Sequence, residues 1–216
     1  MDKIILNNNM IEGQIRPTNG ITKDIISAFA SVVRSDFVPT EFLIRAYTEK
    51  NIQISQNRFI LKPSLTAQII NYIDPRENES ILVLPASTGY LSAILSKLSE
   101  TVVAIEEDEN LISFAEQAMY KSSINNVVFL KKRINENSLD HGPFNVIIIE
   151  GAIDFVPEQF LKQLEDKGRL FALINDGEVS NAKLYTKYNN SINSKYLFSA
   201  KVPKLNFFMK KNRFSF

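Results

Sequence analysis

Residues 80 to 107, which read SILVLPASTGYLSAILSKLSETVVAIEE, decide the fold of this chain. An apolar strand over Ile81–Leu84 leads through a turn of small residues into a helix over Leu91–Leu98, and a second apolar strand follows at Thr101–Glu106. This order predicts a βαβ unit, in which free N–H groups at the start of the helix attract the polar end of a nucleotide-like ligand.

Glu106 ends the second strand of this unit. Counted from Pro85 in the turn, it lies 106 − 85 = 21 residues further along the chain. An acidic side chain about 20 residues after such a turn accepts hydrogen bonds from the ribose hydroxyls of a dinucleotide or adenosine ligand. We therefore predict that Glu106 binds a ribose, and the alternative is a solvated strand end.

The turn itself departs from a glycine-rich nucleotide turn. Glycine is used there because the ligand lies against the backbone and some positions need a positive φ. This turn reads Pro85-Ala86-Ser87-Thr88-Gly89 and keeps only its last glycine. Proline removes one N–H donor, and Ser87 adds a Cβ where the ligand would approach. The turn thus predicts the fold more strongly than it predicts a cofactor.

The rest of the chain alternates between helical and strand patterns. Thr22 is placed to cap a helix that ends before Pro39, helical spacing returns at Ser64–Ile73, and residues 1–63 are predicted to form an N-terminal helical extension. Further elements are expected as a helix over Asn110–Ser122, strands over Val127–Leu130 and Phe144–Glu150, a helix over Pro157–Leu164 and a strand over Arg169–Ile174. Short apolar strands separated by helices predict a doubly wound, mostly parallel α/β sheet.

The tail follows a different pattern. Lys183–Tyr188 and Tyr196–Val202 are joined by a turn at Asn189-Asn190-Ser191, and Arg213–Phe216 adds a further strand-like stretch. These segments predict an antiparallel C-terminal addition. The 216 residues are therefore expected to form a single domain, 1–216, in which a Rossmann-like core and the C-terminal strands occupy residues 64–216.

Several motifs occur in the order known from one enzyme family. Residues 10–17 read MIEGQIRP, Gly20-Ile21-Thr22 precedes VRSDFVP at residues 33–39, and GPFNVII follows at residues 142–148. With the Thr88-Gly89-Tyr90 turn, they resemble the protein-L-isoaspartate O-methyltransferase family, especially its divergent bacterial members. The resemblance implies a Rossmann-like methyltransferase fold, S-adenosylmethionine as cofactor, and methyl transfer to a protein carboxylate in protein repair.

The resemblance also implies where the cofactor lies: its methionine end against the backbone of the turn, and its ribose on Glu106. Tyr90 either covers the ligand or packs the first helical turn, and packing is the preferred reading. Glu150 ends a strand at the carboxyl edge, where open α/β sheets bind ligands. It either forms a wall of the ligand pocket or belongs to an ordinary acidic loop. The predicted cofactor site consists of Ala86, Ser87, Thr88, Gly89, Tyr90, Glu106 and Glu150. No catalytic residue is assigned.

Some positions depart from the family pattern where its chemistry would lie. Val83 stands in place of an acid in the first strand, Pro85 and Ser87 replace glycines, and Arg133 replaces the acid of a G-D-G motif. Residues 59–63, FILKP, align with T-I-S-Q-P, whose hydroxyls lie beside the methyl acceptor. These departures predict that S-adenosylmethionine binds weakly or is lost, and that isoaspartyl substrates are recognised poorly. The alternative function is a binding or interaction module on a degenerate methyltransferase scaffold.

The composition limits the partners. With 25 basic and 24 acidic residues, the chain has no general attraction for nucleic acid or membranes, so a protein or peptide substrate is expected and the oligomeric state is left open. Basic residues around Lys131-Lys132-Arg133 and in the tail, with Phe207, Phe208 and Phe214, could stack bases. The alternative, that the phenylalanines enter the core while lysines face water, agrees better with the neutral charge.

Cysteine is absent, which excludes disulfides and thiolate sites. No cluster of metal ligands is visible, and His141, the only histidine, is expected in a surface turn. The first residues lack the apolar run of a signal peptide, and no stretch approaches the roughly 18 apolar residues of a membrane span. These features predict a cytoplasmic protein.

Overall fold

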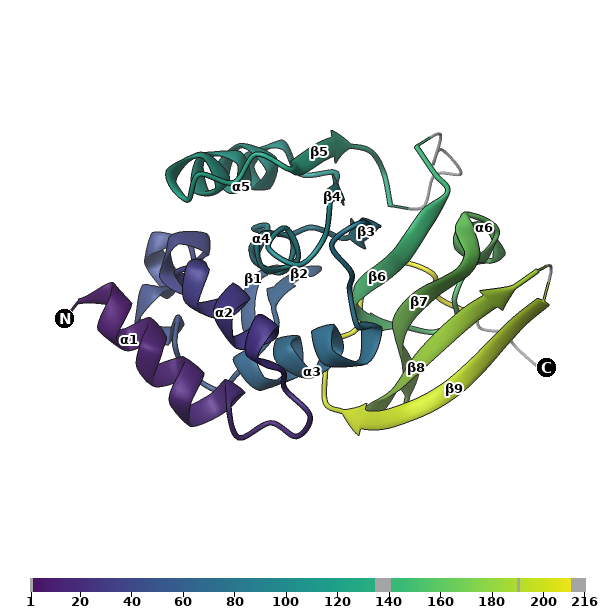
Figure 1. Cartoon of the computed structure of the whole chain (residues 1–216), viewed down its shortest axis with the longest axis horizontal. Coiled ribbons are helices and arrows are strands. Elements are labelled where there is room, and N and C mark those ends of the chain that lie inside the picture. Colours follow the sequence, from purple (N-terminus) through teal and green to yellow (C-terminus); the bar gives the residue numbers. More distant parts are fainter. Residues whose placement is uncertain (1, 135–140, 190, 211–216) are drawn as a thin grey trace, which may run out of the picture.

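The computed structural model describes residues 2–134, 141–189 and 191–210, and its centre is a mostly parallel sheet (Figure 1). Its strands are β3 Ser80–Leu84, β4 Thr101–Glu106, β5 Val127–Lys131, β6 Phe144–Ile153, β7 Leu164–Asp176, β8 Val179–Tyr188 and β9 Ser191–Ala200. Within the described ranges the strand order is β5-β4-β3-β6-β7-β8-β9. Strands β3 to β7 pair in parallel, whereas β8 and β9 pair antiparallel. The predicted fold class, with its antiparallel C-terminal addition, is confirmed.

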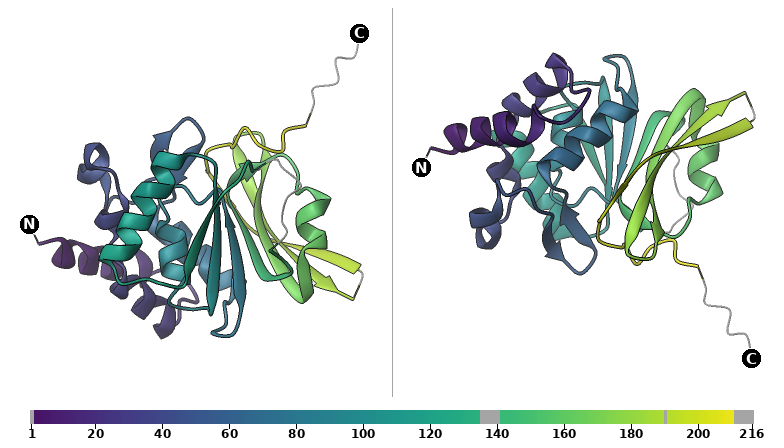
Figure 2. Two further views of the ribbon diagram at one scale, coloured as in Figure 1. Left: turned by 90° about the horizontal axis from the view of Figure 1, so that it is seen from above. Right: turned by 90° about the horizontal axis from the view of Figure 1, so that it is seen from below.

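Helices cover both faces of the sheet, as the two views of Figure 2 show. They are α3 Pro63–Ile73, α4 Tyr90–Leu95, α5 Glu109–Lys121 and α6 Glu158–Lys162. Alternate residues of β3 enter different cores: Val83 packs in the cluster beneath α3, α4 and α5, while Leu82 and Leu84 pack in the cluster beneath α6. This two-sided burial explains why the central strands are apolar without interruption.

The N-terminal extension begins with helices and ends in a hairpin. It contains α1 Lys3–Met10, the π-helix η1 Ile11–Ile15, α2 Lys23–Ser31, the 3₁₀ segments η2 Arg34–Phe37 and η3 Thr40–Arg45, and the strands β1 Ile52–Ser55 and β2 Arg58–Ile60. Thr22 caps α2 as predicted, because its side chain accepts the N–H of Ile25 at 3.3 Å. The purely helical prediction missed the antiparallel hairpin β1–β2, whose strands are too short to show a clear alternation.

The remaining predicted elements differ mainly in their bounds. Helix α4 stops at Leu95 rather than Leu98, and α6 begins one residue later and ends two residues earlier than expected. Strands β6 and β7 are longer than predicted, and β9 begins directly after the turn, at Ser191. The strand-like stretch predicted over Arg213–Phe216 lies outside the described residues. The extension and the sheet share one hydrophobic cluster, and the single domain stays a prediction.

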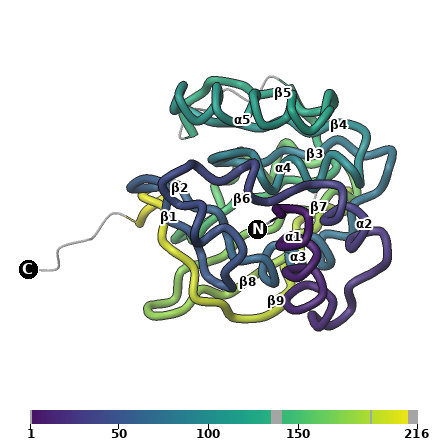
Figure 3. The backbone as a smooth tube through the Cα atoms, turned by 90° about the vertical axis from the view of Figure 1, so that its left-hand side faces the viewer, coloured from purple at the N-terminus to yellow at the C-terminus, as the bar shows by residue number. Residues whose placement is uncertain are grey.

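After β9 the chain returns to the carboxyl end of β6. We call residues 203–208 the C-terminal segment. The N–H of Leu205 donates to the carbonyl of Ala152 at 2.8 Å, and the N–H of Ala152 donates to the carbonyl of Pro203 at 3.1 Å. Gly151 permits this approach, because a Cβ there would lie 2.6 Å from Leu205 Cγ. Figure 3 shows this segment running beside the hairpin β1–β2, so both cover the carboxyl edge.

An ion pair closes the opposite, amino edge of the sheet. Arg169 of β7 donates to both carboxylate oxygens of Glu79, at 2.7 and 2.8 Å, and to the carbonyls of Ile73 and Asp74 at the end of α3. Burial raises the pKa of Glu79, but hydrogen bonds and the charge of Arg169 outweigh it and hold the pKa below its ordinary value. The pair therefore fixes α3 on the sheet.

We predict that Arg169→Met lowers the free energy of unfolding by about 3 kcal/mol, because Glu79 is left without its partner in a largely buried position. Lys131→Met is the matched control, since it breaks an exposed pair with Glu109 and should cost less than about 1 kcal/mol. Urea unfolding of both variants measures the difference. Equal losses would show that the Arg169 pair adds nothing beyond a surface contact.

Candidate cofactor site

The turn between β3 and α4 contains one glycine, and two of its residues have a positive φ. Ser87 has φ of +51°, in the left-handed region that glycine occupies most easily, and Gly89 has φ of +83°. A Cβ on Gly89 would lie 3.1 Å from the side chains of Ala115, Met119 and Phe129. Gly89 is therefore favoured by its φ and by tight packing against α5 and β5, whereas Ser87 adopts a positive φ with a side chain present.

Several hydroxyls around this turn are buried without partners. Within the part of the chain that the structure describes, Ser87 Oγ, Thr88 Oγ1 and Ser92 Oγ have no hydrogen-bond partner. Buried polar atoms are normally satisfied by protein, ordered water or a ligand. Because Ser87 and Thr88 lie on the turn itself, their unpaired hydroxyls make the turn a candidate contact for a polar ligand.

Glu106 lies at the end of β4, fully buried. Its carboxylate accepts the backbone N–H groups of Ser87 at 2.9 Å, Glu107 at 2.8 Å and Asp108 at 3.1 Å. It also accepts from Arg58, whose Nε lies 2.8 and 2.7 Å from the two oxygens and whose Nη2 lies 2.6 Å from Oε1. The alternative of a solvated strand end is therefore wrong.

Arg58 reaches Glu106 from the first position of β2. Its side chain is 5% exposed, its Nη1 donates to the carbonyl of Asn57 at 3.0 Å, and its guanidinium lies 5.2 Å from the ring centroid of Phe207. Asn57 Oδ1 in turn accepts the N–H of Asn206 at 3.3 Å. The hairpin and the C-terminal segment thus enclose the guanidinium on Glu106.

Glu150 lies in a second buried polar group at the carboxyl end of β6. Burial raises the pKa of Glu150 to about 8, although the charge of Arg34 and the backbone of Leu61 act in the opposite direction. Arg34 is fully buried and donates to the carbonyls of Ala46 at 2.7 Å and Leu61 at 2.8 Å. Its Nη1 has no hydrogen-bond partner among the described residues.

Tyr90 packs beside this group. Its ring lies between Phe29 and Phe37, with centroid distances of 6.3 and 6.0 Å, and the Arg34 guanidinium lies 4.6 Å from its centroid. These contacts agree with the preferred packing role, and a contact of Tyr90 with the cofactor stays a prediction. Burial raises the pKa of Tyr90 to about 12, so its hydroxyl stays protonated at neutral pH.

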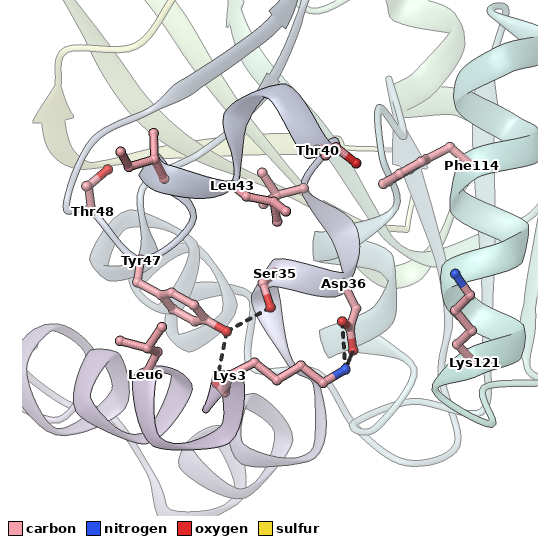
Figure 4. Close-up of a pocket in the computed structure, with 12 residues that line it drawn as sticks. Lys3, Leu6, Ser35, Asp36, Thr40, Leu43, Tyr47, Thr48, Phe114 and Lys121 are labelled. Carbon is pink, nitrogen blue, oxygen red and sulfur yellow. Dashed lines mark hydrogen bonds and ion pairs between the residues drawn. The ribbon is translucent and has the colours of Figure 1, made fainter. Parts of the chain in front are cut away.

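A cavity of about 750 Å³ lies away from the β3–α4 turn (Figure 4). It is lined by α1, η2, η3 and α5, and Lys3 crosses it to pair with Asp36 at 2.8 Å. The hydroxyl of Tyr47 lies 3.0 Å from the Lys3 carbonyl and 2.9 Å from Ser35 Oγ. None of the seven predicted site residues lines this cavity, so size alone does not locate the site.

The predicted site residues thus form two groups. The backbone N–H of Ser87 joins the turn to Glu106, while Glu150 lies with Arg34 near Tyr90. The sequence interpretation missed Arg58, which lies 48 residues before Glu106. The available signal was one arginine beginning the otherwise apolar run 58–61.

Other predictions concern the surface. His141 is exposed in a turn, as expected. Phe207 is buried and Phe208 packs on Phe160 at 5.4 Å, in agreement with the core reading, whereas Lys211, Arg213 and Phe214 lie outside the described residues. Within the described ranges, no group of three or more His, Cys, Asp or Glu is placed to bind a metal ion, and no helix has the length and apolar character to cross a membrane.

The model of the Protein-L-isoaspartate(D-aspartate) O-methyltransferase (PCMT) family matches residues 6–203. The chain belongs to this family. A protein-L-isoaspartate O-methyltransferase from Methanospirillum hungatei is 27% identical over 178 residues, which cover 82% of each chain. One from Thermosipho melanesiensis is 27% identical over 188 residues, which cover 85% of this chain and 95% of the relative.

Solved structures named for the same family share the fold. One protein-L-isoaspartate O-methyltransferase has a TM-score of 0.79 at 20% identity; the match covers 95% of this chain and 66% of that one. A Plasmodium falciparum protein of this name, in complex with S-adenosyl-L-homocysteine, has a TM-score of 0.75 at 20% identity, and the match covers 94% and 97% of the two chains. PCMT proteins are enzymes that use S-adenosylmethionine, so the predicted family, fold and enzyme class are confirmed.

The chain's own residues fit one end of that cofactor better than the other. The turn offers unpaired hydroxyls and a glycine-like backbone, which suit the polar methionine end. Glu106 stands where a ribose acceptor is expected, but its oxygens are already bonded to Arg58 and to three backbone N–H groups. As arranged, Glu106 does not fit a ribose.

We predict that Glu150→Gln flattens the dependence of stability on pH. Because the pKa of Glu150 is about 8 in the folded protein and near 4.5 when unfolded, the folded state alone keeps its proton between these values, and stability falls as pH rises through this window. Between pH 5 and 8 the parent should lose on the order of a few kcal/mol more than the variant. Urea unfolding at both pH values measures this, and parallel losses would show that Glu150 is ionised when folded.

Proposed function

We propose that this chain transfers a methyl group from S-adenosylmethionine to a carboxylate on a protein or peptide, with reduced cofactor affinity. The observation that carries the proposal is the β3–α4 turn, where Ser87 keeps a glycine-like φ and the hydroxyls of Ser87 and Thr88 are buried without partners. PCMT membership supplies the reaction class. The absence of cysteine suits the reducing cytoplasm, where we place the protein.

When bound, the cofactor supplies a methyl group that its sulfonium has already activated. The protein's contribution is therefore mainly to position the acceptor, which is a large effect in reactions between two bound groups. The backbone of Ala86, Ser87 and Gly89 and the hydroxyl of Thr88 would hold the methionine end. Their burial under α5 keeps water from that end of the site.

The acceptor side differs from the family pattern. Phe59 and Leu61 stand where the T-I-S-Q-P motif carries hydroxyls, and both are buried, at 5% and 1% exposed. An apolar wall cannot donate hydrogen bonds to an acceptor carboxylate or orient it. We therefore propose a protein carboxylate other than isoaspartate as the preferred acceptor.

A second candidate is a protein that kept the methyltransferase scaffold as a binding module. The observation in its favour is the closed contact between Arg58 and Glu106, which leaves a ribose without its acceptor. The two candidates differ in one measurable property, because only the enzyme transfers labelled methyl groups to protein.

We predict that S-adenosylhomocysteine binds with a dissociation constant weaker than low micromolar. Loss of the N–H at Pro85 and of an available Glu106 each removes a hydrogen bond of roughly 1 kcal/mol or more. Isothermal calorimetry on the full chain measures the affinity. Low-micromolar or tighter binding would contradict the expectation. No detectable heat, together with no label transferred to protein from radioactive S-adenosylmethionine, would favour the binding module.

We predict that methyl transfer to a synthetic isoaspartyl peptide is slow or undetectable, because Phe59 and Leu61 provide no donors for its carboxylate. The matched control is the same peptide with a normal aspartyl residue. Release of labelled methanol after base treatment measures ester formation on each peptide. Rapid labelling of the isoaspartyl peptide alone would restore the family's usual specificity to this chain.

A further inference from the structure

The Arg58 guanidinium lies where a ribose diol would need the Glu106 carboxylate. A ribose donates its hydroxyls to such an acid, so it requires free acceptor lone pairs. Arg58 covers both oxygens of Glu106 at 2.6 to 2.8 Å, and three backbone N–H groups use further acceptor positions. A carboxylate has about four acceptor sites, so this one is saturated.

The contact is held from outside by two segments. The ring of Phe207 lies 5.2 Å from the guanidinium, and the N–H of Asn206 donates to Asn57 beside it. A cation over an aromatic face is stabilised further when it is desolvated, as Arg58 is. The contact between Arg58 and Glu106 is therefore stabilised by the hairpin and the C-terminal segment together.

A second carboxylate, that of Glu107, also contacts the guanidinium of Arg58. Glu107 accepts Arg58 Nη2 at 3.1 Å, and its side chain is 36% exposed, whereas that of Glu106 is fully buried. A cavity of about 380 Å³ beside Arg58 is lined by Asn57, Glu107 and Asp108. A rotation toward this cavity would keep one ion pair while freeing the buried acid.

We propose that Arg58 is the residue that determines cofactor affinity in this chain, as an internal competitor of the ribose for Glu106. The inference rests on the proposed function, because it assumes that the ligand is S-adenosylmethionine or its product. Only protein molecules with Arg58 displaced toward Glu107 offer Glu106 to the ligand. The measured affinity is then lowered by the fraction of molecules in that state.

The experiment is calorimetric titration of the full chain with S-adenosylhomocysteine. Arg58→Ala should bind roughly 10- to 100-fold more tightly than the parent, the gain expected when a competent state of about 1–10% becomes the whole population. Arg58→Lys, which cannot hold the carboxylate with a planar fork, should show a smaller gain in the same direction. Arg58→Ala combined with Glu106→Gln should lose most of the gain.

Arg169→Met is the control, because it breaks an arginine–glutamate pair at the far edge of the sheet and should leave the affinity unchanged. Circular dichroism confirms that each variant is folded, and Arg58→Lys decides the outcome if Arg58→Ala does not fold. Parent-like or weaker binding by the folded Arg58 variants overturns the inference and leaves the proposed function intact. Absence of binding in every folded protein, with no methyl transfer, overturns the proposed function as well.

Discussion

The buried ion pair between Arg58 and Glu106 joins three parts of the chain that are distant in sequence: the hairpin, the end of β4 and the C-terminal segment. Removing one partner of such a pair costs about 3–5 kcal/mol, but a well-packed apolar pair in the same place is often as stable. The main effect of the Arg58–Glu106 pair is therefore to position the segments that it joins. It fixes the hairpin over the carboxyl edge and connects the N-terminal extension to the ligand-binding edge of the sheet.

In the turn after β3, Ser87 occupies a position whose positive φ favours glycine. Ser87 occupies the left-handed region at a cost of roughly 1 kcal/mol or more relative to glycine, and its N–H still points to Glu106. Ser87 thus adopts a φ typical of glycine, while its side chain takes up space beside the turn. At Gly89, where φ is also positive, an added Cβ would lie 3.1 Å from three side chains, so a substitution there is strained by the backbone and crowded as well.

Much of the architecture could be predicted because its signals are local. The βαβ unit, the place of Glu106 and the antiparallel tail follow from apolar runs, turn residues and a spacing of 21. Arg58 could not be assigned in this way, because its partner lies 48 residues away and the hairpin that carries it has strands of four and three residues. The proximity of Arg34 to Glu150 could not be predicted for the same reason. It depends on how the N-terminal extension folds back over the sheet.

The two edges of the sheet carry similar pairs with different consequences. Glu79 at the amino edge accepts one backbone N–H, from Arg76, besides its two bonds to Arg169, so its charge depends on the arginine. Glu106 accepts three backbone N–H groups, from the turn and from the start of the loop before α5, and none of these donors belongs to the hairpin that carries Arg58. The hydrogen bonds of Glu106 thus come from the turn, from the loop before α5 and from the hairpin, and Arg58 is one of several donors to that carboxylate.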